Sequence, residues 1–294
     1  TTGFPLDMQI AKGASSANAH FLMTRNLGLN TRDSTSNRTR VLQPADGALG
    51  SLNNLTRSVY NTTFGMPTAY ANNLMIFQSF KRAPGFMDIV NYRGNDTTRS
   101  LNHNLGVVPE MMWVKKWGAS GDRRWQIYMA PLGNTRYSPG FKTDPFYTSS
   151  NRFSSTPTST QFTLGTDADL NGSGAQFVNF LFASLPGISK VGSYSGTGNA
   201  INVDCGFTTG ARFVMIKRTD TEIQGTTPNR TDWFIWDYAR GIVSGNDPYY
   251  RLSAGAAEVT NTDYIDPLST GFTVNTSGTG INVSGGTYVF FAIA

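Results

Sequence analysis

The sequence has few of the residues on which catalysis and cross-linking depend. Its 294 residues include one cysteine, two histidines and only three glutamates, and charged residues make up 15% of the chain. A single cysteine cannot form an intramolecular disulfide. Two histidines far apart in the sequence leave little material for a catalytic triad or a two-histidine metal site. No run of 18 apolar residues is present, so the sequence predicts no membrane-spanning helix.

The scarce residues themselves have ordinary structural interpretations. Cys205 is followed by Gly-Phe, and we expect it to be a small buried hydrophobic residue. His20 and His103 lie in different parts of the chain, and we expect each to be a surface or hydrogen-bonded loop residue. The sequence therefore predicts no catalytic residues, no cofactor and no enzyme activity.

Clustered positive charge is also missing. The formal net charge is +5, but the Lys and Arg residues are scattered, with no block of five or more. Phosphate contact requires clustered cations, so the sequence predicts no nucleic-acid partner.

What the chain does contain is Gly, Ser, Thr and Asn, together with a long internal similarity. FKRAPGFMDIVNYRGN begins at Phe80, and FASLPGISKVGSYSGTGN begins at Phe182. Five identical pairs keep one offset of 102: Phe80 with Phe182, Pro84 with Pro186, Gly85 with Gly187, Tyr92 with Tyr194, and Gly94 with Gly196. An offset of this size predicts repeated structural units of domain length.

Further matching stretches extend the similarity over the chain. GFPLDMQIAK, LGVVPEMMWVKK and CGFTTGARFVMIKR each end in an apolar run, and they place Lys12, Lys115 and Lys217 at equivalent positions. WQIYMAPLG begins at Trp125 and WFIWDYARG at Trp233, with HFLMTRNLG from His20 as a weaker match. Alternation puts Trp125 and Ile127 on one face of a strand, and Trp233 and Ile235 on the same face of another. Each unit closes with an apolar strand that ends near Phe80, Ala183 or Ala294.

These patterns predict an all-β protein with little helix, built from three tandem antiparallel β-sandwich units of about 100 residues, immunoglobulin-like or jelly-roll-like. The units would be residues 1–84, 85–186 and 187–294, which we call the first, second and third segments. The Pro-Gly pairs would be the hinges between them, because Pro ends a sheet ladder and Gly permits unusual dihedral angles. The closing strands and the Trp strands would form the core of each unit. The first segment lacks an opening strand, so we expect further sequence, such as another domain, upstream of Thr1.

Metal binding has weak candidates in two acidic turns. Asp167 and Asp169 lie in GTDADLNGSG, and Asp263 and Asp266 lie in NTDYIDP. Alternating Asp and Asn can supply oxygen ligands to calcium, but neither turn has the closing Glu of an EF-hand loop. Solvated turns are the alternative interpretation, and the sequence favours it.

Aromatic residues between the predicted strands are the candidates for contact with a receptor or partner, because they can stack on sugars or pack against another chain. Two predicted hairpin loops, WGASGDRR from Trp117 and TEIQGTTPNR from Thr221, would be presented at the end of a sandwich. Packing inside the unit is the alternative for each aromatic residue. The candidates are Trp117, Tyr137, Tyr147, Tyr249, Tyr250 and Tyr264.

The longer strings together resemble a known family. RAPGFMDIVNYRGN, HNLGVVPEMMWVKK, FASLPGISKVGSYSGTGN, DCGFTTGARFVMIKRTD, DWFIWDYARGIVSGNDP and TYVFFAIA resemble phage proteins, chiefly of marine phages and cyanophages, that carry a domain of unknown function in tandem. The resemblance covers nearly the whole chain from Gly3, and members often carry a lectin-like sandwich domain upstream. His20 departs from the pattern by replacing Trp in the first segment.

The resemblance implies a virion structural protein, such as a tail fibre or another appendage involved in host attachment. It brings no catalytic residues. It implies a location on the virion and a homo-oligomer, with a trimer favoured by the way phage fibres are built. The expected partners are other virion proteins, with a host cell-surface glycan as a further candidate. The alternatives are a capsid decoration or spike protein and, with less support, a polysaccharide depolymerase.

Overall fold

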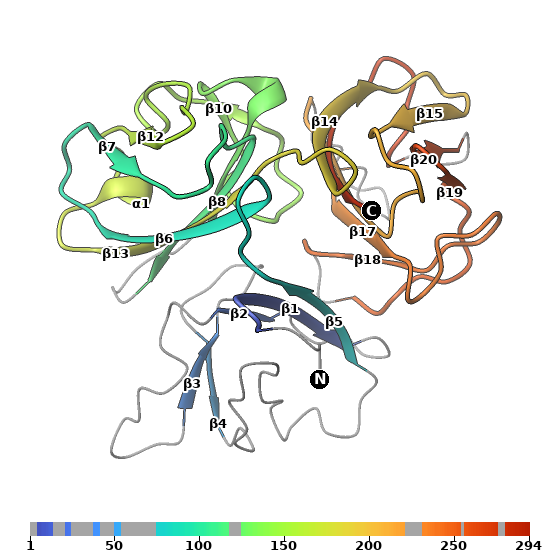
Figure 1. Cartoon of the computed structure of the whole chain (residues 1–294), viewed down its shortest axis with the longest axis horizontal. Coiled ribbons are helices and arrows are strands. Elements are labelled where there is room, and N and C mark those ends of the chain that lie inside the picture. Colours follow the sequence, from blue (N-terminus) through green and yellow to red (C-terminus); the bar gives the residue numbers. More distant parts are fainter. Residues whose placement is uncertain are drawn as a thin grey trace.

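The protein is an all-β chain of antiparallel sheets, as predicted. The computed structural model describes residues 5–13, 21–24, 38–41, 50–53, 75–117, 125–220, 231–253, 256–275 and 280–294. Within these ranges helix is limited to one turn, α1 (Ala168–Asn171), and a 3-10 turn, η3 (Ala130–Leu132). Figure 1 shows three groups of strands placed around a common centre, one from each segment.

The described part of the first segment forms a three-stranded sheet and a hairpin. The sheet has the order β2-β1-β5, and the hairpin pairs β3 with β4. The strands are β1 (Met8–Gly13), β2 (Phe21–Thr24), β3 (Arg38–Val41), β4 (Gly50–Asn53) and β5 (Met75–Phe80).

The second segment has a four-stranded sheet in the order β6-β13-β8-β9, with the strand pairs β7-β12 and β10-β11 beside it. Its strands are β6 (Met87–Arg93), β7 (Arg99–Asn102), β8 (Met111–Trp117), β9 (Trp125–Met129), β10 (Arg136–Tyr137), β11 (Tyr147–Thr148), β12 (Gln161–Leu164) and β13 (Gln176–Phe182).

The third segment repeats this plan with a five-stranded sheet, β14-β21-β16-β17-β18, and a three-stranded sheet, β15-β20-β19. Its strands are β14 (Ser189–Ser195), β15 (Ile201–Asp204), β16 (Phe213–Arg218), β17 (Trp233–Asp237), β18 (Tyr249–Arg251), β19 (Ile265–Leu268), β20 (Gly271–Val274) and β21 (Thr287–Ile293).

The strand register confirms the equivalence predicted for the three lysines. Each lies on the strand beside a closing strand: Lys12 pairs with Ile76 of β5, Lys115 with Val178 of β13, and Lys217 with Val289 of β21. The neighbouring Trp strands agree, since Lys115 also pairs with Trp125 and Lys217 with Trp233. His20, the weaker match, lies outside the described residues.

Buried residues on both faces explain why the central strands read as continuous apolar runs. One face of the second segment's large sheet packs on the β7-β12 pair, through residues such as Val114 and Phe162. One face of the third segment's large sheet packs on β15-β20-β19, through residues such as Phe234 and Phe272.

The opposite faces of the three large sheets meet in one hydrophobic cluster, which we call the shared core. It combines residues of β1 and β5 with residues of the second and third segments, among them Ile10, Phe80, Trp113, Trp125, Phe182, Trp233 and Phe291. The prediction that the Trp strands supply core residues is correct, but the location is not. Trp125 and Trp233 face the common centre and not the interior of their own segment, because alternation sends their neighbours to that interior.

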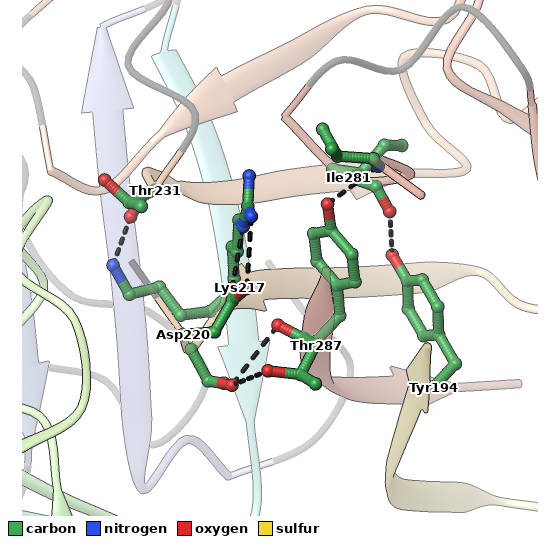
Figure 2. A network of polar contacts seen from close by, with 10 residues as sticks. Tyr194, Lys217, Asp220, Thr231, Ile281 and Thr287 are labelled. Atoms are coloured by element: carbon green, nitrogen blue, oxygen red, sulfur yellow. Dashed lines mark hydrogen bonds and ion pairs between the residues drawn. The ribbon is translucent and has the colours of Figure 1, made fainter. Parts of the chain in front are cut away.

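A buried asparagine holds the start of the second and third segments in the same way. Asn171 donates from Nδ2 to the carbonyl of Thr97 (2.7 Å), and Asn282 donates to that of Asn199 (2.7 Å). Nearby, Tyr92 donates to the carbonyl of Leu170 (2.7 Å), and Tyr194 to that of Ile281 (2.6 Å; Figure 2).

Glycine is required beside this contact. A Cβ added at Gly94 would lie 2.1 Å from the carbonyl oxygen of Gly172, and one at Gly196 would lie 2.2 Å from that of Val283. The two Tyr-x-Gly strings found in the sequence are therefore packing requirements.

Candidate functional site: a groove along strand β5

A surface groove of about 680 Å³ lies beside β5, and we call it the β5 groove. One wall is the continuous stretch 77–81 of the first segment. The other walls are residues Asp237–Ala239, which end β17 and continue past it, together with Arg212, Phe213 and Ile293. Phe86 and Ile188 complete the lining.

Both Pro-Gly turns contribute to this groove. Phe86 and Ile188 directly follow Gly85 and Gly187, whose φ angles of 75° and 72° lie in the left-handed region that Gly adopts without strain. Each turn is fixed by an equivalent backbone hydrogen bond: Ala183 N–H donates to the carbonyl of Phe86 (3.1 Å), and Ala294 N–H to that of Ile188 (2.9 Å). The turns therefore redirect the chain, as predicted, and also place two apolar side chains in the groove.

Three lining residues are unusually exposed for their type. Phe77 is 42% exposed, Ile188 47% and Tyr238 63%. Arg212 stacks on the Tyr238 ring at 5.2 Å from its centroid and accepts a backbone hydrogen bond from Tyr238 N–H (2.7 Å). The same Arg-Tyr pair borders a second hollow of about 620 Å³, lined otherwise by residues 209–211, Ile242 and 267–269. Exposed apolar side chains gathered in one hollow are typical of an interaction surface.

Two residues of the groove lining, Gln78 and Asp237, belong to a polar network. Gln78 donates from Nε2 to Asp237 Oδ2 (2.9 Å) and accepts from the Tyr250 hydroxyl (2.7 Å). Arg240 donates from Nε to the same Asp237 oxygen (2.8 Å) and from Nη1 to Glu258 (2.7 Å). Burial raises the pKa of Tyr250 above its usual value, so it stays protonated. This network ties β5 to the third segment, and it occupies Asp237, the one carboxylate in the groove lining.

The predicted contact residues divide between surface and interior. Tyr147 is 41% exposed, and Tyr137 is half-buried under Arg152, whose guanidinium lies 4.1 Å from the Tyr137 ring centroid. Tyr249, Tyr250 and Tyr264 are buried, so the expectation that they present a contact surface is wrong for these three. Their side chains pack in the hydrophobic clusters formed by the neighbouring strands. No pattern in the sequence distinguishes them from exposed tyrosines.

Trp117 ends β8, and its side chain lies outside the described residues. The two predicted hairpin loops, 118–124 and 221–230, also lie outside them.

The acidic residues predicted as weak calcium candidates make contacts with other protein groups. Arg152 forms ion pairs with Asp167 (3.2 Å) and Asp169 (3.6 Å), and Asp167 caps α1. Asp263 accepts from the side chain of Asn275. Among the described residues, no group of three or more His, Cys, Asp or Glu side chains is arranged to hold a metal ion.

Asp266 lies near the buried Asp247. Burial raises the pKa of Asp247 to about 7, and the charges of Asp263 and Asp266 add to this effect. Asp247 accepts from the backbone N–H of Val243 (2.8 Å), so it anchors the chain just beyond the Tyr238 turn.

The remaining reactive side chains are also held internally. Cys205 is buried, as predicted, and burial raises the pKa of its thiol to about 12. His103 is a hydrogen-bonded loop residue, as predicted, with Nε2 at 3.1 Å from the carbonyl of Thr158 and Nδ1 accepting from Leu105 N–H. Burial lowers the pKa of His103.

The three equivalent lysines are buried at one end of the shared core. Lys115 and Lys217 lie over the rings of Trp125 (5.4 Å) and Trp233 (5.9 Å), in cation–π contact. Lys217 also donates to the carbonyls of Lys142 (3.0 Å) and Thr231, the latter drawn in Figure 2. Burial, with a contribution from Arg251, lowers the pKa of Lys12 to about 8.

Comparison with known proteins gives one result. Residues 73–294 match a family described as a domain of unknown function, DUF7483. This match covers well over half of the sequence. The chain belongs to that family. No curated protein and no solved structure matches it significantly.

Sequence reasoning missed Phe77, Ile188 and Tyr238, the exposed residues of the β5 groove. Ile188 carried a usable signal, because it follows a Pro-Gly turn in the same way as Phe86. Phe77 and Tyr238 carried none, since both belong to apolar runs that alternation assigns to buried strands. Among the described residues no helix is long and apolar enough to cross a membrane.

Proposed function

We propose that this chain is a structural protein of a bacteriophage particle, and specifically a component of a tail fibre or similar appendage that contacts the host. The proposal rests on two observations. The repeated sequence strings resemble those of phage proteins, and the three sheets of the chain pack against one shared hydrophobic core. As part of it, we propose that the three segments are tandem β-sandwich units and that copies of the chain assemble as a homotrimer.

The observation that carries the proposal is the shared core. Three sheets bury one face each against a common centre, so most of their large side chains serve packing. The titratable groups described above are held in internal contacts, and the groove carboxylate Asp237 is fully engaged by Gln78 and Arg240. A glycosidase would need two carboxyl groups facing a substrate cleft. This arrangement supports a structural or binding role for the chain more than a catalytic one.

Attachment would use exposed aromatic residues on this rigid body. Tyr147 and Tyr238 are both accessible, and aromatic rings of this kind stack on sugars. Weak contacts repeated by several copies would give avidity without a deep pocket. A host cell-surface glycan is therefore the receptor class that we propose to screen.

Immunogold electron microscopy of the producing virus tests the proposed location. Antibody against this chain should place gold on the tail or its fibres. Gold spread over the capsid would replace this proposal with a decoration or spike protein. No gold on intact particles would overturn both, and assays for polysaccharide cleavage would then come first. Sedimentation of the purified chain, 32.0 kDa per copy, tests the trimer separately.

A further inference from the structure

The pair formed by Arg212 and Tyr238 lies where the two surface hollows adjoin. Both side chains line the β5 groove, of about 680 Å³, and both also line the second hollow, of about 620 Å³. Tyr238 is 63% exposed, more than any other large apolar or aromatic side chain in the described part of the chain. Volumes of this size are typical of clefts that bind small ligands. The pair is therefore the centre of a surface that extends into both hollows.

Backbone hydrogen bonds hold this pair in place. Arg212 directly precedes β16, and its N–H donates to the carbonyl of Ile293 (2.7 Å). Tyr238 directly follows β17, and its N–H donates to the carbonyl of Arg212 (2.7 Å). The ring is thus positioned by two strands of one sheet while much of it stays in contact with water. A ligand that stacks on this ring would need to order little of the protein.

The guanidinium of Arg212 is available for an anion. Within the described ranges no carboxylate forms an ion pair with it, and its recorded contact is the Tyr238 ring at 5.2 Å. Other arginines of the second and third segments do form ion pairs: Arg152, Arg218, Arg240 and Arg251. The carboxylate in the groove lining, Asp237, is already paired with Arg240, while the other charged residue there is the exposed Lys81. The lining of the two hollows is therefore complementary to negative charge.

The types of group present indicate a sugar that carries a carboxylate. A tyrosine ring presents an apolar face on which a sugar ring can stack, and a guanidinium pairs with a carboxylate through two parallel hydrogen bonds. Thr209 and Ser269, both exposed in the lining of the second hollow, can exchange hydrogen bonds with sugar hydroxyls. A neutral glycan would use the ring and the hydroxyls but would leave the guanidinium without an anionic partner.

We propose that the Arg212–Tyr238 pair and its two hollows bind an acidic glycan built from uronic-acid residues. A sugar ring would stack on Tyr238, its carboxylate would pair with Arg212, and the neighbouring sugars would extend into the hollows. This inference rests on the proposed attachment function. It narrows the receptor class from glycans in general to those that carry carboxylates, and it assigns the site.

Calorimetric titration of the full chain tests the ligand class. The probes are oligomers of galacturonate, glucuronate and mannuronate, each compared with its own methyl ester, which keeps the sugar rings but removes the charge. We expect saturable binding of at least one of the three acids, weakened at least about tenfold by esterification. Oligoglutamate of equal charge, which carries carboxylates without sugar rings, should also bind at least about tenfold more weakly. Absence of binding by all three acids would overturn the proposal, as would equal binding of the ester or of oligoglutamate.

Chain variants test the site. Arg212→Gln should weaken binding of the acid at least about tenfold and leave binding of the ester unchanged. Tyr238→Ala should weaken binding of the acid to a similar extent, whereas Tyr238→Phe, which keeps the ring, should bind like the parent. Both side chains are exposed, so the far-ultraviolet circular dichroism should not change. The two positions are tested separately, so a folding defect at one leaves the other as the test.

Arg93→Gln is the charge-matched control. Arg93 is exposed at the end of β6 and lies outside the lining of both hollows. Its loss should leave binding unchanged. Equal losses for Arg93→Gln and Arg212→Gln would mean that the glycan responds to net charge alone, and unchanged binding in Arg212→Gln and Tyr238→Ala would place the glycan elsewhere. Either result would overturn the assignment. Immunogold labelling reports the location on the particle independently, so gold on the fibres without uronate binding would retain the proposed function and remove this inference.

Discussion

Strands β5 and β21 have the same place in their segments but different neighbours. Both pair with a lysine-bearing strand in the same register and both send alternate residues into the shared core. Phe77 of β5 and Phe290 of β21 occupy matching register positions, yet Phe77 is 42% exposed and Phe290 is 3% exposed. The difference shows that register fixes which face a side chain joins, while the neighbouring elements decide whether that face is covered.

The largest loss of stability is expected from substitutions in the shared core, to which both β5 and β21 contribute residues. Trp233 contacts Phe141 (5.4 Å between ring centroids) and Phe146 (6.3 Å), both in the second segment. Trp233→Ala should lower the free energy of unfolding by about 3–5 kcal/mol, because it opens a large cavity in a packed core. Hydrogen exchange should rise in β8 and β9 as well as in β16 and β17.

Trp125→Ala is the matched variant from the second segment, and it should destabilise both segments to a similar extent. If either variant accelerates exchange only in its own segment, the shared core does not couple the sheets. The comparison of β5 with β21 would then have to treat each sheet as packing independently.

The two buried asparagines test what holds the opening strands β6 and β14 in place beside β13 and β21. Asn282 accepts from Thr197 N–H (3.0 Å) and donates to the carbonyls of Asn199 (2.7 Å) and Asn275 (3.1 Å). Asn282→Ala should cost about 2–4 kcal/mol in a urea titration, because buried backbone groups lose their partners. Asn171→Ala, at the corresponding position, should cost a similar amount. Unequal costs would show that the two opening strands are held by different means.

The free energy of unfolding should depend on pH through Asp247, which anchors the chain just beyond the Tyr238 turn. Its pKa is raised to about 7 from the model-peptide value of 3.8. Because the folded pKa is the higher one, this group's contribution to stability is fully present below about pH 4 and is lost as the pH rises through about 7. Asp247→Asn removes the titration. The change in unfolding free energy between about pH 4 and about pH 8 should shrink by on the order of 1–3 kcal/mol.

Urea titrations of the Asp247→Asn variant and the parent chain at both pH values measure this difference. Asp220, whose carboxylate is paired with Arg218, provides the control. Burial alone raises the pKa of Asp220, but the hydrogen bonds and positive charge of Arg218 outweigh this effect and lower that pKa overall. Asp220→Asn should leave the change between about pH 4 and about pH 8 nearly as it is in the parent chain. Parallel profiles for Asp247→Asn and the parent would mean that Asp247 does not titrate in this range.

Part of this architecture could be read from the sequence. The equivalence of the lysines, the Pro-Gly turns and the facing of Trp and Ile side chains follow from offset and alternation, and the register agrees with them. The shared core could not be read in this way. Both faces of each central strand are apolar, so alternation separates two sets of residues without saying which set faces another segment. The β5 groove depends on that assignment, and Phe77 and Tyr238 were missed for this reason.

The smallest expected change in stability comes from Phe77, and it can be compared directly with Phe290 at the matching position of β21. Phe77→Ala should change the free energy of unfolding by less than about 1 kcal/mol, because much of this side chain is already in contact with water. Phe290→Ala, at the matching position of β21, should cost about 3–5 kcal/mol, because its ring packs on Phe272 at 5.5 Å between centroids. Thermal unfolding of the two variants under one condition measures the contrast. Equal losses would mean that Phe77 is covered in solution, and the edge of β5 would then already have a neighbour.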